Sequence, residues 1–332
     1  MNILGIETSC DETSAAVVVD GKVILSNVIS SQIDIHRATG GVVPEVASRS
    51  HLEKINLVID EAIASASITL LDLHAVAVTN RPGLIGALLV GVSAAKAMGF
   101  ALKIPVVPIH HIEAHIYANW LSDLEPTLPL VCLVVSGGHT EIFHMTGHGT
   151  YNVLGRTRDD AAGEAFDKSA RLLGLPYPGG IEIDRLSRKG DPRRVTLPRT
   201  QFGSDSLDFS FSGLKSAVIQ ATARQKNASV SLEDWCASIQ QAIVEILVDN
   251  TVRAAVLTGA KTVAIAGGVA ANHLLQTTLS VECARRDIAF SCPPSILCTD
   301  NAAMIACAAH YALLNKTHFD RDFDTYSSER LA

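Results

Sequence analysis

The sequence lacks the marks of a secreted protein. Its 332 residues include seven cysteines, an odd number, and none of them forms a C-x-x-C pair. A disulfide framework is therefore not expected, and the cysteines are interpreted as reduced thiols. The first residues, Met1–Gly5, run directly into a strand-like segment and show no signal peptide. Together these absences predict a cytoplasmic protein.

Standard nucleotide-binding motifs and an excess of basic charge are also missing. No glycine-rich turn matches the P-loop or the G-x-G-x-x-G pattern. The formal net charge of −7 argues against a non-specific polyanion binder, so contact with nucleic acid would need a local basic patch or a partner. Apolar residues make up 48% of a chain that is long enough for two domains or one two-lobed body, so we expect a sizeable core.

One apolar run is long enough to be mistaken for a membrane span. Gly83 to Leu102 contains a single charged residue, Lys96, over about the length that a bilayer requires. It also contains four glycines, has no aromatic belt, and lies between two strand-like runs at 75–79 and 104–109. We expect a buried helix packed on a sheet, and no membrane association.

Two parts of the chain repeat the same order of elements. A strand at 3–7, a turn rich in hydroxyl side chains and a strand at 15–19 follow one another, and this order recurs within 130–145. The repeat predicts an α/β protein with two similar lobes around a cleft. We expect an N-terminal lobe at 1–126, completed by a helix at 302–315, a C-terminal lobe at 127–301 and a charged, mobile tail at 316–332.

The first candidate for chemistry is a pair of histidines, His111 and His115, at the start of a predicted helix. Four residues apart, their imidazoles leave the same face, which is the spacing that two histidines need to share one metal ion. Zinc peptidases place a glutamate directly after the first histidine, but here the acid is Glu113, about 200° around the helix from His111. A peptidase site would therefore lack its base. Ordinary polar side chains without a metal remain the alternative.

Asp11 and Glu12 are candidates for contact with the metal or a substrate, with simple turn chemistry as the alternative.

Other candidates follow strands or open helices. The turns Ser136–Gly138 and Gly267–Gly268 come after strands, where glycine lets a phosphate or base approach the backbone, and plain tight turns are the alternative. Asn272 and Asp300 each precede a helix, so each is either an N-cap or a ligand. Asp300 would complete a His₂Asp set that suits Fe(II) or Zn. Asp167 is either a solvated helix residue or a contact to ribose or a polar substrate.

Seven ordered motifs are similar to those of one known family. They cover nearly the whole chain, from the N-terminus to about Leu314, and comprise residues 5–13 (GIETSCDET), 81–84 (RPGL), 111–115 (HIEAH), 135–140 (VSGGHT), 209–215 (FSFSGLK), 266–272 (AGGVAAN) and 298–302 (CTDNA). In these motifs the chain resembles the TsaD family. The tail beyond Lys316 has no counterpart in the resemblance.

The resemblance implies a tRNA-modifying acyltransferase. Such an enzyme moves the threonylcarbamoyl group from threonylcarbamoyl-adenylate to the N6 amine of adenosine 37, in tRNAs reading codons that begin with A, and releases AMP. The implied fold is the actin, Hsp70 and sugar-kinase type, with duplicated RNase H-like lobes around a nucleotide cleft. The resemblance also implies a paralogous partner of the same fold, TsaB, and a P-loop ATPase partner, TsaE.

Site residues are implied by the same resemblance. His111, His115 and Asp300 would hold one divalent ion, Fe²⁺ or alternatively Zn²⁺. The adenylate would be bound by nine residues: Val134, Val135, Ser136, Gly137, Gly138, Asp167, Gly180, Asp184 and Asn272. The ion would orient the donor carbonyl and stabilise charge as the amine attacks. No catalytic residue is assigned, because none stands out as a general base for the adenine amine.

Three points stay open. The basic stretch from Arg185 to Arg199 is either a contact to tRNA phosphates or a solvated face. An ATPase or small-molecule kinase of the same fold is one alternative function, although such an enzyme would require a Mg²⁺-binding acid in place of the histidine pair. A metallopeptidase is the other, and it predicts protein cleavage that a chelator abolishes.

Overall fold

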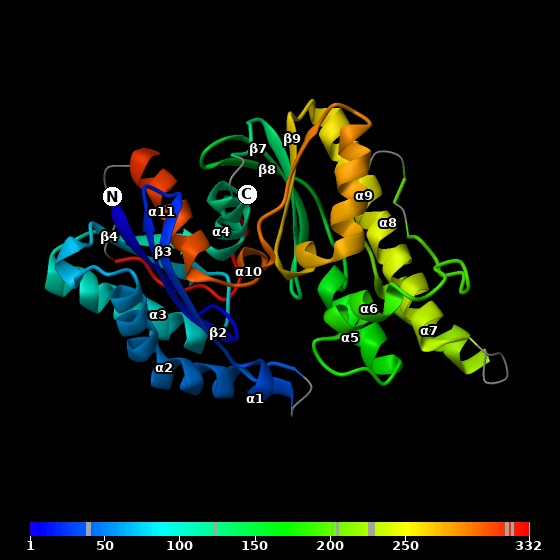
Figure 1. Cartoon of the computed structure of the whole chain (residues 1–332), viewed down its shortest axis with the longest axis horizontal. Coiled ribbons are helices and arrows are strands. Elements are labelled where there is room, and N and C mark those ends of the chain that lie inside the picture. Colours follow the sequence, from blue (N-terminus) through cyan, green and yellow to red (C-terminus); the bar gives the residue numbers. More distant parts are fainter. Residues whose placement is uncertain are drawn as a thin grey trace. The chain divides into compact units, whose positions relative to one another are not determined.

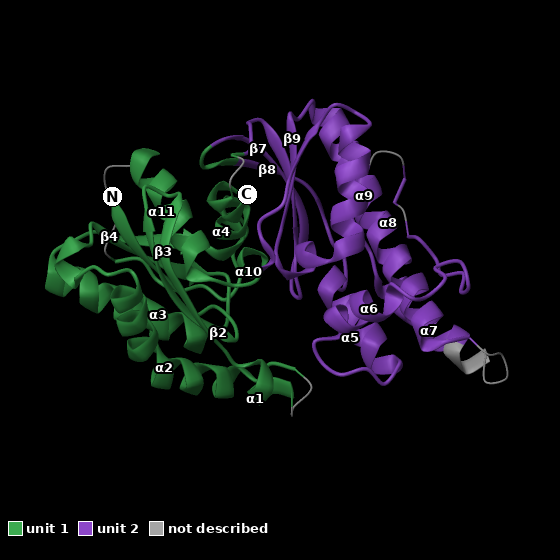
Figure 2. Ribbon diagram, viewed as in Figure 1, with its two compact units in different colours: residues 1–125, 148–150, 296–332 green, residues 126–147, 151–295 purple. Residues whose placement is uncertain are grey.

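The computed structural model describes residues 1–37, 41–122, 125–200, 202–203, 206–224 (backbone alone at 222–224), 230–315, 319 and 322–331. They form two compact units (Figure 2). Unit 1 consists of residues 1–125, 148–150 and 296–332, and unit 2 of residues 126–147 and 151–295. The lobes expected from the sequence stay a prediction, because compactness alone does not show which segments fold independently.

Unit 1 is built on a five-stranded sheet (Figure 1). The order of its strands is β3-β2-β1-β4-β5. Its strands are β1 (Asn2–Glu7), β2 (Glu12–Val19), β3 (Val23–Ser31), β4 (Ala75–Arg81) and β5 (Val106–His110). β1 pairs antiparallel with β2 and parallel with β4. The turn between β2 and β3 uses Asp20 and Gly21, whose φ angles of 51° and 66° lie in the left-handed region that a tight hairpin requires.

Helices cover both faces of this sheet. They are α1 (Ile33–Arg37), α2 (Pro44–Ser65), α3 (Ile85–Leu102), α4 (His111–Tyr117), α10 (Ser295–Cys298) and α11 (Ala302–Asn315), with short turns η1 (Leu70–Asp72) and η2 (Ala118–Leu121). α2 and α3 pack on Leu4 and Ile6 of β1, and α11 lies on the opposite face (Figure 1). Gly5 permits this close approach, since a Cβ at that position would lie 2.1 Å from Ala302 O.

Unit 2 repeats the plan of unit 1. Its sheet has the order β10-β9-β6-β7-β8, formed by β6 (Leu130–Val135), β7 (Thr140–Gly147), β8 (Thr150–Arg156), β9 (Thr262–Ala266) and β10 (Ala289–Ser291). β6 pairs antiparallel with β7 and parallel with β9, as β1 does with β2 and β4. The repeat of strand, polar turn and strand expected from the sequence is thus present in both sheets. The sequence reading missed β8.

The helices of unit 2 are α5 (Ala162–Leu172), α6 (Gly179–Ser187), α7 (Ser212–Arg224), α8 (Leu232–Thr258) and α9 (His273–Ala284), with the turn η3 (Gly268–Ala271). Asp159 and Asp160 precede α5, where acidic residues suit the start of a helix, but α5 begins only at Ala162. The carboxylate of Asp159 instead accepts hydrogen bonds from Phe211 N at 2.8 Å and Ser212 N at 3.3 Å. It therefore caps α7, a long-range contact that local pattern does not reveal.

α3 is the apolar run that raised the question of a membrane span. Among the described residues it is the one helix long and apolar enough to cross a bilayer, with a mean hydropathy of 1.8. Its glycines bring it close to the sheet, because a Cβ on Gly91 would lie 2.5 Å from Thr8 Oγ1. One face is buried, as expected, whereas Ile85, Leu89 and Phe100 are exposed.

Part of the C-terminal tail, which its charge predicted to be mobile, packs on unit 1. Residues 316–318, 320–321 and 332 lie outside the described part, but 322–331 pack on unit 1. The Phe323 carbonyl accepts a hydrogen bond from Lys96 Nζ at 2.6 Å, and the Phe323 ring joins the core. Farther along, the Glu329 carbonyl lies 3.0 Å from His110 Nε2. Backbone atoms, one aromatic ring and an ion pair between Arg81 and Glu329 at 3.5 Å thus dock the described part of the tail. Mobility of the rest of the tail stays a prediction.

Candidate metal centre and substrate site

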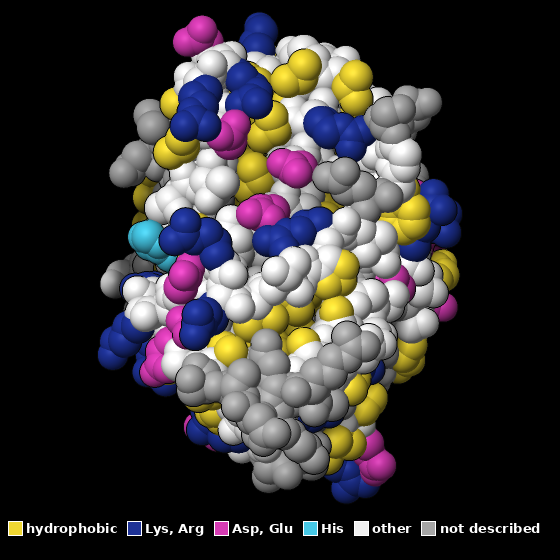
Figure 3. Space-filling model, turned by 90° about the vertical axis from the view of Figure 1, so that its right-hand side faces the viewer, with side chains coloured by type: hydrophobic (Ala, Val, Ile, Leu, Met, Phe, Trp, Pro, Cys, Tyr) yellow, Lys and Arg dark blue, Asp and Glu magenta, His cyan; other side chains and the backbone are white. Residues whose placement is uncertain are grey.

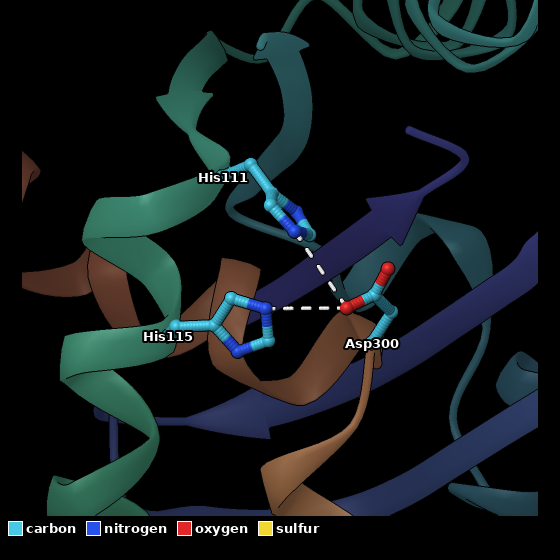
Figure 4. A group of neighbouring side chains, drawn as sticks. All are labelled: His111, His115 and Asp300. Carbon is cyan, nitrogen blue, oxygen red and sulfur yellow. Dashed lines mark ion pairs between the residues drawn. The ribbon is translucent and has the colours of Figure 1, made fainter. Parts of the chain in front are cut away.

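The histidine pair lies where β5 passes into α4. His110 ends the strand and caps the helix, since its Nδ1 accepts a hydrogen bond from Ile112 N at 3.2 Å. His111 and His115 then project from one face of α4 toward Asp300, which lies between α10 and α11 (Figure 4). One donor atom from each residue lies within 4.8 Å of the other two. All three residues belong to unit 1, although Asp300 is remote from the histidines in sequence.

Asp300 faces both imidazoles through one oxygen. Its Oδ1 is 3.1 Å from His115 Nε2 and 3.6 Å from His111 Nε2 (Figure 4). The neighbouring residue, Asn301, makes a capping contact at the start of α11, because its Oδ1 accepts a hydrogen bond from Met304 N at 3.1 Å.

The donor set fits a divalent ion. Both ring nitrogens of His115 are buried, and within the described residues Nδ1 has no hydrogen-bond partner while Nε2 faces only the carboxylate of Asp300 at 3.1 Å. A metal ion between Nε2 and Asp300 would be well placed to bind both. Two imidazoles and one carboxylate suit a borderline cation such as Fe²⁺ or Zn²⁺ better than Mg²⁺. Glu113, two residues after His111, is not a member of the cluster. Glu113 therefore does not supply the general base that a zinc peptidase would need at this position.

The electrostatics of the centre also favour a cation. Burial lowers the pKa of His111, but the charges of Asp300 and Glu7 outweigh it and raise that pKa to about 9. Burial lowers the pKa of His115, and the charge of His111 adds to that effect. Burial raises the pKa of Glu12 to about 10, with Asp300 and Asp11 contributing. Carboxyl groups crowd this site, so a positive ion there would be attracted by several of them.

The second group of predicted residues lies in unit 2, at the carboxyl ends of β6 and β9. These strands are parallel neighbours, so the turns that follow them meet at one edge of the sheet. Gly267 has a φ of 89°, and a Cβ there would lie 2.4 Å from Val135 O. A Cβ added at Gly137 or Gly138 would meet no atom within 4 Å, and the amides of these two residues donate no hydrogen bond within the described residues. The first turn can thus offer N–H groups to an anion.

Val134 and Val135 are fully buried strand residues, so only their backbone could reach a ligand. Ser136 shapes the turn: its N donates to His139 O at 2.8 Å, and its Oγ accepts from His139 N at 3.2 Å. The Ser136 carbonyl accepts from Gly163 N at 3.1 Å, near the start of α5. These bonds hold the turn in shape without using its glycine amides.

Asp167 and Asp184 are tied to α6. Asp167 Oδ1 accepts from Gly179 N at 2.7 Å and Gly180 N contributes a further hydrogen bond, while burial raises the pKa of the carboxyl group. Asp184 Oδ2 pairs with Arg188 at 2.7 Å. Its other oxygen, Oδ1, is buried and has no partner within the described residues. Of the two acids, Asp184 has the freer atom for a polar ligand.

Asn272 does serve as the cap of α9. Its Oδ1 accepts from Leu275 N at 3.0 Å, and its Nδ2 donates to Gln240 Oε1 at 2.9 Å. Gln240 Nε2 donates in turn to Ser187 Oγ at 2.9 Å, so this amide joins α9 to α6. Gln240 was missed by the sequence reading, and nothing in its local pattern within α8 marks it.

The fold is that of known two-lobed proteins. The chain superposes on HypF of T. kodakarensis with a TM-score of 0.66 at 15% identity, over 95% of this chain and 48% of that chain. Component A of the (R)-2-hydroxyglutaryl-CoA dehydratase of Acidaminococcus fermentans gives a TM-score of 0.57 at 15% identity, over 95% and 100%. At such identities the likeness concerns the fold alone, and it confirms the expected actin-, Hsp70- and sugar-kinase-like class.

Sequence comparison then defines the family. The family model of the tRNA N6-adenosine threonylcarbamoyltransferases, TsaD, matches residues 23–307. The protein of that name from Clostridium botulinum (strain 657 / Type Ba4) is 50% identical over 335 residues, covering 100% of this chain and 98% of its own. That from Clostridium perfringens (strain SM101 / Type A) is 53% identical over 316 residues, covering 94% and 93%. The chain belongs to the TsaD family, as its seven motifs indicated.

Proposed function

We propose that this chain transfers the threonylcarbamoyl group from threonylcarbamoyl-adenylate to the N6 amine of adenosine 37 in tRNAs reading codons that begin with A, releasing AMP. The observation that carries the proposal is identity of 50% along the whole chain to relatives named for this transfer. The His₂Asp cluster supports it, since an acyl transfer gains from a fixed positive charge beside the carbonyl. The cytoplasm, where tRNA is modified, is the proposed location.

His111, His115 and Asp300 would hold one divalent ion, Fe²⁺ or alternatively Zn²⁺. When bound, the ion supplies positive charge that orients the donor and stabilises developing negative charge on its oxygen. The protein's own part is to bury both imidazoles away from water and to favour the neutral form of the His115 ring. Burial of His115 supports that role, because it disfavours the protonated ring.

The adenylate would bind to unit 2. The free amides of Gly137 and Gly138 would donate to its phosphate, and the backbone of Val134 and Val135 would border the ligand. Asp184 Oδ1 would accept a hydrogen bond from a ribose hydroxyl, which its lack of a described partner supports. Asp167 acts by holding Gly180 at the start of α6, and Asn272 by holding the start of α9.

Mass spectrometry of tRNA nucleosides tests the function directly. Cells depleted of this protein, and lacking any paralogue of it, should lose threonylcarbamoyladenosine. Wild type should restore the nucleoside and His111→Ala should not. His74→Ala is the matched control. His74 is exposed and stands directly before β4, whereas His111 stands directly after a strand, β5. Persistence of the nucleoside in depleted cells would reject the transferase, and ATP turnover without tRNA would then test the kinase-like alternative.

The basic stretch that was a candidate tRNA contact is largely paired. Four of its six cations lie beside carboxylates: Arg185–Glu182 at 2.6 Å, Arg188–Asp184 at 2.7 Å, Arg193–Asp191 at 3.3 Å and Arg199–Glu245 at 2.6 Å. The face drawn in Figure 3 has a similar character, with Lys and Arg side chains interspersed with Asp and Glu. Lys189 and Arg194 have no ion pair within the described residues, so we propose these two as the phosphate contacts.

Charge reversal tests whether the cations without an ion pair, rather than the paired ones, contact tRNA. Lys189→Glu combined with Arg194→Glu should weaken tRNA binding and flatten its dependence on salt concentration. Arg185→Glu is the control, because the charge of Arg185 is already offset by Glu182. Equal affinities of the double variant and the control would remove this part of the proposal.

Partner proteins complete the proposal. Exposed apolar side chains on α2 and α3, namely Leu52, Leu57, Leu89 and Phe100, support a protein partner of unit 1. We propose a paralogue of the same fold, TsaB, together with the P-loop ATPase TsaE. Co-purification of the three chains should fail when Leu57 and Phe100 are replaced by glutamate. Recovery of an intact complex from that variant would exclude this surface.

A further inference from the structure

Glu7 ends β1 as a carboxylate with no exposure to solvent. The four residues before it, Ile3 to Ile6, are apolar or glycine, as suits a central strand. Burial of an ionised carboxyl group is strongly unfavourable unless hydrogen bonds and opposite charge replace its water. An apolar residue would fill the same place without that penalty, so the acid requires a reason of its own.

Three donors surround this carboxylate. Ser9 N donates to Oε1 at 2.5 Å, Thr79 Oγ1 donates to Oε2 at 2.6 Å, and His111 Nδ1 lies 3.1 Å from Oε2. Because both oxygens act as acceptors, the hydrogen between Glu7 and His111 belongs to Nδ1 of the ring. Ser9 Oγ, 3.2 Å from the same nitrogen, is a further partner for it.

An imidazole that keeps its hydrogen on Nδ1 can bind a metal only through Nε2. Nε2 is the atom of His111 that faces Asp300 Oδ1, 3.6 Å away (Figure 4). A carboxylate on the far nitrogen of a ligand histidine sets both the tautomer and the direction of the ring. We propose that Glu7 is a positioning residue of the metal centre, which holds His111 with Nδ1 protonated and Nε2 directed toward Asp300.

The proposal rests on the proposed metal site. It assigns different means of orientation to the two histidines of that site. His115 Nδ1 is buried and has no hydrogen-bond partner within the described residues. His111 is thus the ligand whose orientation is held by a carboxylate, whereas His115 is oriented by its packing. Loss of Glu7 should therefore act on metal binding through His111.

Zn²⁺ affinity, measured by competition with a chelator on the full chain, and the visible spectrum of the Co²⁺ form test this role. Glu7→Gln has nearly the same size but cannot accept on both atoms, so its amide N–H₂ must face either Ser9 N–H or His111 Nδ1–H. We expect Zn²⁺ to bind about 10- to 100-fold more weakly and the Co²⁺ spectrum to change. Thr79→Val removes one donor but leaves the contact with His111, and should bind Zn²⁺ nearly as wild type does.

A double-mutant cycle checks the route of the effect. In a His111→Gln background, Glu7→Gln should weaken Zn²⁺ binding no further. If Glu7→Gln does not fold, Glu7→Asp keeps the charge but withdraws it from the ring, and an intermediate loss is expected. A folded variant with wild-type affinity and spectrum would overturn the positioning role, as would an equal loss in Thr79→Val. Failure of the wild type to bind Zn²⁺ or Co²⁺ stoichiometrically would instead overturn the metal site itself.

Discussion

Gly5 links the packing of unit 1 to its metal centre, and Gly5→Ala should damage both. The added Cβ would lie 2.1 Å from Ala302 O and 2.9 Å from Ala306 N, both backbone atoms of α11. To restore an ordinary contact of 3.4 Å, the helix must move away from β1 by about 1.3 Å. Overpacking of this kind typically costs about 1–3 kcal/mol, and backbone atoms cannot yield by changing rotamer.

Movement of α11 would also displace the metal ligand Asp300, because Asp300 precedes α11 by two residues. With a cost near 2–3 kcal/mol, the Tm of a chain of this length should fall by about 3–4 °C. A ligand misplaced by about 1 Å can lower a rate by about 100-fold, so transferase activity and Zn²⁺ affinity should fall more than stability alone explains.

Calorimetry and Zn²⁺ titration of Gly5→Ala, side by side with Gly213→Ala, provide the assay. A Cβ on Gly213, in the first turn of α7, would meet its nearest neighbour, Thr200 Oγ1, at 3.5 Å, which is an ordinary contact. That control should keep or slightly raise the Tm, since alanine favours a helix by about 0.5–1 kcal/mol over glycine. If Gly5→Ala melts and binds Zn²⁺ as the wild type does, α11 does not pack on β1 as described.

Two further predictions concern the same unit. Deletion of 322–332 should destabilise it by about 1–2 kcal/mol through loss of the partly buried Phe323 ring, and Phe323→Ala should account for most of that loss; an unchanged Tm would mean that the tail does not dock. Burial lowers the pKa of His51, which lies between Thr13 Oγ1 and Cys10 O, so the folded state keeps this ring neutral. Its contribution to stability is complete above pH 6.5 and falls as the pH drops toward the lowered pKa, because the unfolded chain then binds more protons. The Tm of His51→Gln should therefore depend less on pH below 6.5 than that of the wild type, and parallel curves would contradict the assignment.

Local patterns in the sequence determined much of the architecture. Alternating apolar residues and the Asp20-Gly21 turn specify hairpins because the period of a strand and the φ angles of its turn depend only on neighbouring residues. The same holds for the spacing of His111 and His115, which places both rings on one face of a helix wherever that helix lies. The repeated order of strand, polar turn and strand also revealed the duplicated fold.

Tertiary structure decided which polar residues serve as caps and which serve the site. Asn272 and Asp300 each precede a helix in sequence, yet Asn272 caps its own helix, whereas Asp300 faces the two histidines and Asn301 makes the capping contact with Met304 N. Asp159 precedes α5 but caps the distant α7. These outcomes depend on partners far away in sequence, which no local pattern contains. Glu7 is the sharpest case: in sequence it is an acid at the end of an apolar strand, and only the return of α4 beside β1 brings His111 to its carboxylate.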